Sequence, residues 1–320
     1  MASPGLSEIL TTTLEHRSKK LADNVTVNHA LLNRLNSKSN IQLTPGGASI
    51  LQELEYAENS TYTRYSGYEL LNISPSDVFT AAEFDWKQAA VAVSISGLEQ
   101  LKNSGPDQMI PLLTSRVKNA EKTMRNNISA DIYSAGTASG GKQIGGLQLL
   151  VADDPTTGTV GGINRANWAF WKNKITDLGA SSFTSTNIQG YMNAMYVQLV
   201  RGNDKPDLIV ADNTTYIKYL ESLQTIQRIT SDSMASAGFT SLKFMNSDVV
   251  LDGGYGGDAP SNHMYFLNTD YIHWRPHRDR NMVPLDPDRF STNQDAVVKL
   301  IGFAGNMTIS NCFLQGVLFT

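Results

Sequence analysis

The chain has 320 residues, of which 41% are hydrophobic and 18% are charged, and its formal net charge is −4. A chain of this length can bury a large enough core to fold without disulfides, and its single cysteine, Cys312, excludes an internal disulfide and indicates a reducing compartment. The small negative charge provides no general attraction for nucleic acid. The N-terminus lacks a basic segment followed by an apolar core, and no run approaches about 18 apolar residues. We therefore expect neither a signal peptide nor a membrane span, and expect folding in the cytoplasm.

Residues 7–38 have the apolar spacing of helices, interrupted by the β-branched residues of 25–27. This segment carries two more basic than acidic residues and has too little apolar surface to form a core of its own. It is therefore predicted to be an arm that lies on another surface.

From residue 50 the apolar period changes from that of a helix to that of a strand. One strand-like run covers 50–56 and a second covers 79–95, with turn-forming residues between them. In the second run Phe84 and Trp86 share one parity, whereas the aliphatic residues of 89–95 share the other. The change of parity predicts a bulge, or a strand whose two halves pack on different surfaces.

The segment 50–86 is both acidic and aromatic. It contains seven acidic residues, seven aromatic residues and one basic residue, Arg64, which gives it a net charge of −6. A two-stranded hairpin is marginally stable in water and cannot cover so many aromatic rings, and a large exposed apolar area usually marks a contact surface. Two interpretations remain open at this point: the hairpin contacts a partner, or it folds back on its own domain.

A long helix is predicted over 106–134, where Pro106 and Asp107 suit the first turn and Gly136 ends the helical pattern. At about 1.5 Å per residue this helix would span roughly 40 Å. One side of it carries an apolar stripe, which consists of Leu113, Val117, Ala120, Met124, Ile128 and Ile132. Another face is basic and consists of Arg116, Lys118, Lys122 and Arg125.

Helices and strands alternate in the rest of the chain. The patterns predict a helix over 187–201 and a second one that is capped by Asn213 and runs to about 224. Strands are predicted over 207–211, 242–251, 263–274, 296–303 and 307–319. The last two strands are predicted to be hinged at Gly305 and Asn306. No internal repeat of fixed period occurs, so the predicted fold class is mixed α+β.

Three short patterns resemble chemical motifs but lack parts of them. Residues 136–143 match the GxxxxGK part of a phosphate-binding loop, but Gln143 replaces the hydroxyl residue that ligates magnesium, and the run follows a helix. His273 and His277 have the spacing of metal ligands on a helix, but the proline between them disfavours a helix. Cys312 lies in a hydrophobic run, which favours an inert buried thiol. We therefore predict no catalytic, cofactor-binding or metal-binding residue, and expect no enzyme.

Two long runs resemble the major capsid proteins of tailed bacteriophages. They are YAENSTYTRYSGYELLNISPSDVFTAAEFDWKQAAVAVSISGLE at 56–99 and IGGLQLLVADDPTTGTVGGINRANWAFWKNK at 144–174. The order of elements is also similar over essentially the whole chain. The resemblance implies the α+β capsid fold that is often called the Hong Kong 97-like fold.

The resemblance also implies a division of the chain. Residues 1–47 would be the N-terminal arm, and 48–95 the extended hairpin loop that reaches across a neighbouring subunit. Residues 96–145 would form the peripheral domain with its spine helix, 146–279 the axial domain, and 280–320 the C-terminal strands that return to the peripheral domain.

The implied function is that of a structural subunit that self-assembles into hexamers and pentamers of an icosahedral phage head enclosing double-stranded DNA. The implied partners are copies of the same chain, a scaffolding protein, a portal, decoration proteins and packaged DNA bound without sequence specificity, with no membrane and no cofactor. The implied location is the virion, after assembly in the host cytoplasm. An encapsulin-like compartment shell that holds enzyme cargo is the nearest alternative, and an oligomeric nucleotide hydrolase using residues 136–143 is an alternative of a different class.

The candidate subunit interface combines the hairpin with the basic helix face, and comprises Glu53, Glu55, Tyr56, Glu58, Tyr62, Arg64, Tyr65, Tyr68, Arg116, Lys118, Lys122 and Arg125. The three glutamates are expected to lie near basic residues of an adjacent subunit. Some members of the family join a hairpin-tip lysine to a neighbouring asparagine, but 48–86 contains no lysine, so we expect a shell without such crosslinks. The chain starts directly at the arm, so a separate scaffolding protein is expected.

Overall fold

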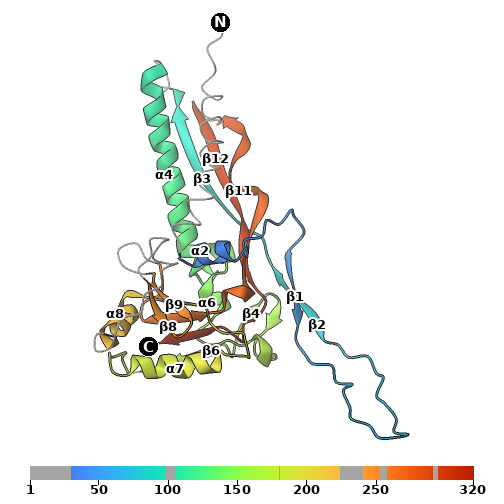
Figure 1. The fold of residues 1–320 in the computed structure, drawn as a ribbon. Helices are drawn as coiled ribbons and strands as arrows, with labels where there is room; N and C mark the ends of the chain where they lie inside the picture. The colour runs from blue at the N-terminus through green and yellow to red at the C-terminus, as the bar shows by residue number, and fades with distance from the viewer. Residues whose placement is uncertain (1–29, 98–105, 180, 224–240, 253–257, 291–294) are drawn as a thin grey trace.

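The computed structural model describes residues 30–97, 106–179, 181–223, 241–252, 258–290 and 295–320. Figure 1 shows three parts: a long helix beside a narrow sheet, a broader α/β body below them, and a hairpin that projects away from both. Residues 7–29 of the predicted arm lie outside the described residues. The described part of the predicted arm, residues 30–47, begins with helix α2 (Ala30–Ser37), which lies on the body.

The projecting hairpin consists of strands β1 (Ile50–Glu55) and β2 (Phe79–Phe84). The two strands pair antiparallel, from Ile50 opposite Phe84 to Glu55 opposite Phe79. Strand β3 (Lys87–Ser96) follows after two residues but belongs to a different sheet. Of the two explanations predicted for the change of parity, the second is therefore confirmed: the two halves of the run pack on different surfaces.

The long helix is α4 (Pro106–Ile132), close to the predicted range. The described part of its apolar stripe is buried, and comprises Val117, Ala120, Met124, Ile128 and Ile132. The helix lies along a three-stranded sheet with the order β11-β12-β3, in which β11 is Ile272–Phe290 and β12 is Ala296–Ile309. Burial of one apolar face against the sheet, rather than helix propensity alone, stabilises a helix of this length.

The predicted hinge at Gly305 and Asn306 is wrong. Strand β12 continues through both residues, and Gly305 pairs with Pro276 on one side and Lys87 on the other. The break comes at 310–315, before β13 (Gly316–Phe319). Gly305 is required by close packing instead, because a Cβ there would lie 2.9 Å from the carbonyl oxygen of Arg275.

The body is built on a six-stranded mixed sheet with the order β6-β13-β10-β7-β9-β8. Its strands are β6 (Lys174–Asp177), β7 (Leu208–Ala211), β8 (Ser241–Phe244), β9 (Ser247–Leu251), β10 (His263–Leu267) and β13. The predicted strand over 242–251 is thus a tight hairpin of β8 and β9. The predicted strand over 263–274 is β10 followed by a 3-10 turn, η2 (Thr269–Tyr271), and the start of β11.

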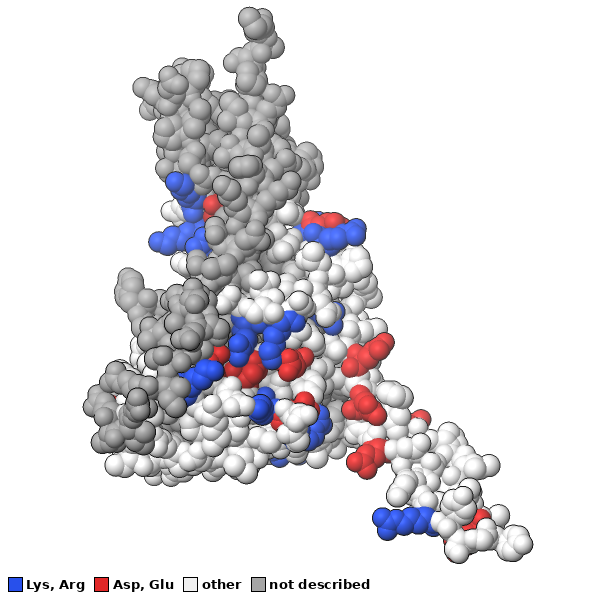
Figure 2. Space-filling model, viewed as in Figure 1, with Lys and Arg blue, Asp and Glu red and all other residues white. Residues whose placement is uncertain are grey.

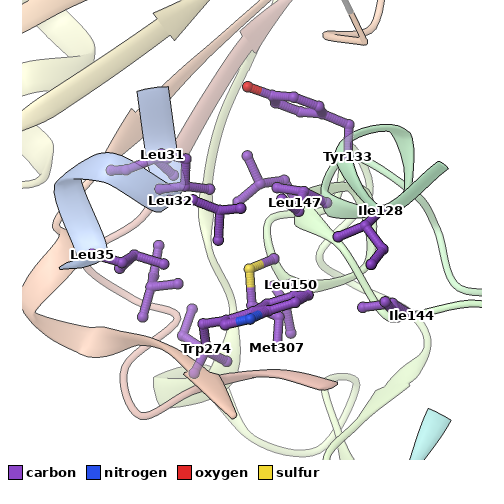
Figure 3. Packing of buried hydrophobic residues seen from close by; sticks show 14 of the residues in the cluster. Leu31, Leu32, Leu35, Ile128, Tyr133, Ile144, Leu147, Leu150, Trp274 and Met307 are labelled. Carbon is purple, nitrogen blue, oxygen red and sulfur yellow. The ribbon is translucent and has the colours of Figure 1, made fainter. Parts of the chain in front are cut away.

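The six-stranded sheet separates two cores, because successive strand residues face opposite sides. Ile209 and Phe266 face helices α7 (Ile188–Gln198) and α8 (Asn213–Ser222). Their neighbours along the strands face the second core, which α2, α4 and the three-stranded sheet share. In Figure 3 Leu31, Leu32 and Leu35 of α2 point toward Trp274, Met307, Leu147 and Leu150 in this second core.

Charged groups also hold α2 on the body. The Arg34 guanidinium lies 2.8 Å from Asp207 and 3.2 Å from Asp248, and Lys38 lies 2.7 Å from Asp270. Asp207 also accepts hydrogen bonds from the backbone N–H and the hydroxyl of Thr269. The prediction that this segment lies on another surface is therefore confirmed for residues 30–37.

Short elements complete the described chain: α5 (Ala138–Gly141), α6 (Leu147–Leu150), β4 (Thr159–Val160), β5 (Ile163–Asn164) and η1 (Ala169–Trp171). The predicted cap of α8 is wrong by one residue. Asp212, not Asn213, is the N-cap, and its carboxylate accepts from the backbone N–H groups of Thr214 and Thr215.

Two predicted boundaries require correction. Strand β13 pairs with β6 and β10, so residues 316–319 belong to the six-stranded sheet and do not return to the sheet beside α4. The boundary at 279 falls inside β11, which already pairs with β12 from Ile272. Both errors have the same cause: strand partners are chosen by contacts between distant segments, and a local apolar pattern does not specify them.

Candidate subunit interface

The two faces of the hairpin differ in composition. Ile50 and Leu54 point inward and are buried, whereas Leu51, Glu53 and Glu55 alternate with them and are exposed. On β2 the exposed residues opposite these three are Glu83, Ala81 and Phe79, respectively. The outer face is therefore a surface of carboxylates and apolar side chains, and Figure 2 shows acidic side chains gathered where the hairpin leaves the body.

The inner face of the hairpin is fixed to the body. Ala82 and Phe84 are buried against the β4–β5 turn, where the Glu83 N–H donates to the Gly161 carbonyl over 2.9 Å. Gly161 has a φ of 57°, and a Cβ there would lie 2.8 Å from the Ala82 Cβ. Glycine is therefore needed both for the turn and for the close approach of the strand.

Side chains of β12 and of the hairpin's own root hold the ends of the hairpin in place. The Asn306 amide donates to the Asp85 carbonyl over 2.9 Å and accepts from the Gly145 N–H over 3.1 Å. Trp86 Nε1 donates to the Gly47 carbonyl over 2.9 Å. The sequence did not predict the role of Asn306, because an asparagine next to a glycine was interpreted as a hinge. Its position in a run of apolar residues was the signal that could have indicated burial.

The loop between the two strands carries most of the predicted interface aromatics. Tyr62 is 80% exposed, Tyr65 is 65% exposed, and Tyr68 is fully exposed, as are the aliphatic side chains of Leu70 and Ile73. Apolar side chains concentrated in this way on one projecting loop are typical of a surface that a partner covers. Within the described residues the loop therefore does not fold back on its own domain.

Tyr56 differs from the other hairpin tyrosines because it is half-buried at the hairpin root. Its ring lies 5.6 Å from the ring of Trp168 and 5.6 Å from that of Phe170, centroid to centroid. It therefore contributes to attaching the hairpin to the body. Glu58 and Arg64, further along the loop, are exposed.

The basic residues of α4 divide into two groups. Lys118 and Lys122 are exposed. Arg116 Nη1 donates to the Ser94 carbonyl over 2.9 Å and so attaches the helix to β3 of its own chain, and Arg125 is half-buried. A groove of about 820 Å³ runs between α4 and the sheet and is lined by Val91, Ala92, Val93, Ser94, Ser96, Arg116, Asn119, Ala120, Thr123, Ala296 and Val298.

The hairpin and the basic helix face lie far apart within one chain, since the hairpin points away from α4 (Figure 1). The described lysines and arginines that form ion pairs do so with acidic residues outside the loop, and none of those pairs involves Glu53, Glu55 or Glu58. Any pairing of the hairpin carboxylates with Lys118 or Lys122 must therefore be intermolecular.

The three motif-like patterns of the sequence, residues 136–143, the pair His273 and His277, and Cys312, lie in surroundings typical of structural residues. Residues 137–142 form one short turn after α4, and the Gly141 carbonyl accepts from Lys87 Nζ over 2.7 Å. His273 and His277 lie on strand β11; burial, with a contribution from the Arg275 charge, lowers the pKa of His273 to about 4. Burial raises the pKa of the Cys312 thiol to about 12. Within the described residues, no group of three or more His, Cys, Asp or Glu is placed to hold a metal ion.

Among the residues that the structure describes, no helix combines the length and the apolar character that crossing a membrane requires.

Comparison with protein-family models and with curated proteins finds no match. Comparison with solved structures finds many. A capsid subunit of cyanophage A-1(L) is 15% identical, with a TM-score of 0.64 over 88% of this chain and 90% of its own. The capsid of a native GTA particle is 10% identical, with a TM-score of 0.53 over 88% of each chain.

A third structure, the holo-SrpI encapsulin complex from Synechococcus elongatus PCC 7942, is 7% identical, with a TM-score of 0.51 over 87% of this chain and 84% of its own. The chain therefore has the fold of phage capsid proteins, which encapsulins share. This confirms the α+β, Hong Kong 97-like architecture that the sequence predicts.

Proposed function

We propose that this chain is the structural subunit of a phage head. In this proposal it self-assembles into hexamers and pentamers of an icosahedral shell that encloses double-stranded DNA. The observation that carries the proposal is the fold, shared over nearly nine-tenths of the chain with a cyanophage capsid subunit. The projecting hairpin adds support, because its exposed tyrosines and leucines require a covering surface.

The hairpin is the proposed grip on the next copy. Its outer face offers Glu53 and Glu55, with Glu58 beyond them, and the exposed Lys118 and Lys122 of a neighbour provide the opposite charge. This contact is heterologous, because the hairpin of one copy binds a different surface on the next copy. Heterologous contacts close into a ring when the rotation between successive copies returns the last copy to the first. The rigid root of the hairpin makes this geometry reproducible from one copy to the next.

The proposed division of the chain into domains follows its helices and strands. Residues 1–47 are the proposed arm and 48–86 the extended hairpin, shorter than the predicted 48–95 because β3 lies in the three-stranded sheet. The proposed peripheral domain consists of β3, α4, β11 and β12. The six-stranded sheet with its helices, β13 included, forms the axial domain that meets symmetry mates. Scaffolding, portal and decoration proteins are the further proposed partners, packaged DNA is bound without sequence specificity, and the mature location is the virion after assembly in the host cytoplasm.

We further propose that the grip is noncovalent. The segment 48–86 contains no lysine. Lys87, the first lysine after it, is half-buried at the hairpin root, and its Nζ donates to the Gly141 carbonyl over 2.7 Å. An amine held in this way is poorly placed to reach an asparagine of another copy.

The second candidate function is an encapsulin-like compartment, which the similarity to the encapsulin complex favours. The two candidates differ in what the shell contains. Nucleic acid in purified shells supports the phage head, and a bound enzyme supports the compartment.

Negative-stain microscopy of the purified chain tests the proposal. We expect closed shells or ring-shaped capsomers. Protein that stays monomeric at concentrations at which capsid proteins assemble completely would contradict both candidate functions.

A further inference from the structure

A small aromatic pocket lies at the root of the hairpin. Tyr56 follows β1, Phe79 begins β2, and Trp168 and Phe170 come from the segment between β5 and β6. The Tyr56 ring lies 5.6 Å from the ring of Trp168 and 5.6 Å from that of Phe170, and the Trp168 ring lies 5.9 Å from that of Phe170, centroid to centroid. The pocket has a volume of about 230 Å³, and Trp168 is 46% exposed at its edge. The rings thus surround an open space.

One carboxylate stands on the wall of this pocket. Asp77 is exposed, and among the described residues it has no hydrogen-bond or ion-pair partner. The pocket is lined by Tyr56, Asp77, Phe79, Thr80, Ile163, Trp168 and Phe170, a set without lysine or arginine. Aromatic faces carry negative electrostatic potential, so the four rings and the carboxylate together attract a cation.

We infer that the pocket binds a lysine or arginine side chain of a second copy of this chain, an inference that rests on the proposed self-assembly. The charge of the pocket selects a basic group, and its size suits one side-chain head group. The pocket also adjoins the acidic outer face of the hairpin, so a copy that covers this face passes over the pocket.

Among the residues that the structure describes, no lysine or arginine fills this position. Arg201 lines the adjacent cleft together with Tyr56, but its guanidinium is already paired with Asp204 at 2.8 Å and donates to the Tyr271 hydroxyl. The described part of the chain does contain a cation over a ring, Lys174 over Phe313 at 3.8 Å, at a different site. We therefore expect the cation in the aromatic pocket to come from another molecule.

An assembly assay tests the occupant. Asp77→Asn removes the exposed carboxylate without touching the core, and Trp168→Leu removes one ring. Asp279→Asn is the matched control, because it removes the same charge by the same substitution at an exposed position of β11, outside the pocket and the hairpin. Followed by light scattering, each pocket variant is expected to raise the half-assembly concentration at least about fivefold, and the control less than about twofold.

A titration of the unassembled subunit tests the site itself. Methylguanidinium chloride serves as the probe, and sodium chloride at equal ionic strength as the reference. The indole N–H signal of Trp168 in a nitrogen-15 spectrum is expected to shift with the probe, and the shift is expected to disappear in Asp77→Asn. A shift of the same size in Asp77→Asn would overturn the site.

The two assays separate this inference from the proposed function. If wild-type shells form and the pocket variants assemble like the Asp279→Asn control, the inference is wrong while the proposed function stands. If the probe binds but assembly is insensitive to both pocket variants, the second copy is excluded as the occupant. If wild-type protein never assembles, the proposed function fails, and the inferred occupant fails with it.

Discussion

Replacing Asn306 with alanine tests whether the hairpin root is locked to the body. The side chain is 4% exposed and joins three segments, because it donates to the Asp85 carbonyl and accepts from the Gly145 N–H. Alanine removes both hydrogen bonds and leaves the buried Gly145 N–H without its partner. A lost hydrogen bond costs about 0.5–1.5 kcal/mol, and an unsatisfied buried group costs about 1–3 kcal/mol. We therefore expect the free energy of unfolding to fall by about 2–4 kcal/mol.

Urea denaturation of the unassembled subunit, followed by tryptophan fluorescence, measures this change. Hydrogen exchange of the Glu83 amide, which donates to the Gly161 carbonyl, reports on the root directly and is expected to accelerate. Asn72→Ala is the control, because the Asn72 side chain accepts only from the nearby Ser74 N–H in the exposed loop. A loss below about 0.5 kcal/mol for Asn306→Ala, the level expected of a surface change, would refute the lock.

Three further predictions concern the grip and the protonation of the core. Denaturing electrophoresis of mature shells is expected to give a monomer band near 35.0 kDa, and a covalent ladder would contradict a noncovalent grip. Reversing the charges of Glu53 and Glu55 to lysine is expected to weaken assembly roughly tenfold, with partial recovery when Lys118 and Lys122 become glutamate; no recovery would exclude this pairing. The pKa of His273 is about 4 in the folded chain, below its ordinary value, so the folded state binds fewer protons than the unfolded state between about pH 4 and 6.5. The stability contributed by this histidine is present above about pH 6.5 and is lost as the pH falls toward 4, and an imidazole signal that titrates near pH 6.5 would contradict the burial.

The sequence predicted the elements whose signal is local. The apolar stripe of α4 specified a helix within two residues of its observed end, because every fourth or third side chain had to face the same sheet. The change of parity between Trp86 and Ala89 specified that the strand changes surfaces, and β2 and β3 do lie in different sheets. The composition of 50–86 left two interpretations open, contact with a partner or folding back on the same domain, and the exposure of Tyr62 and Tyr65 argues against the second.

The sequence could not predict features that depend on distant segments. Asn306 resembles a turn residue beside Gly305, and only the approach of residues 85 and 145 shows that it is a buried bridge. Strand β13 carries the same apolar pattern whichever sheet it joins, so its place between β6 and β10 was missed. The division of the basic helix face was missed for the same reason: Arg116 and Lys118 differ only in whether β3 lies within reach.

Cryo-electron microscopy of particles assembled from the purified chain tests the central claim most directly. We expect closed shells of hexamers and pentamers in which the hairpin of each copy lies across its neighbour, with Glu53, Glu55 and Glu58 against basic side chains of that neighbour. Protein that stays monomeric would contradict the proposed function. Shells in which those three carboxylates face only solvent would contradict the proposed grip.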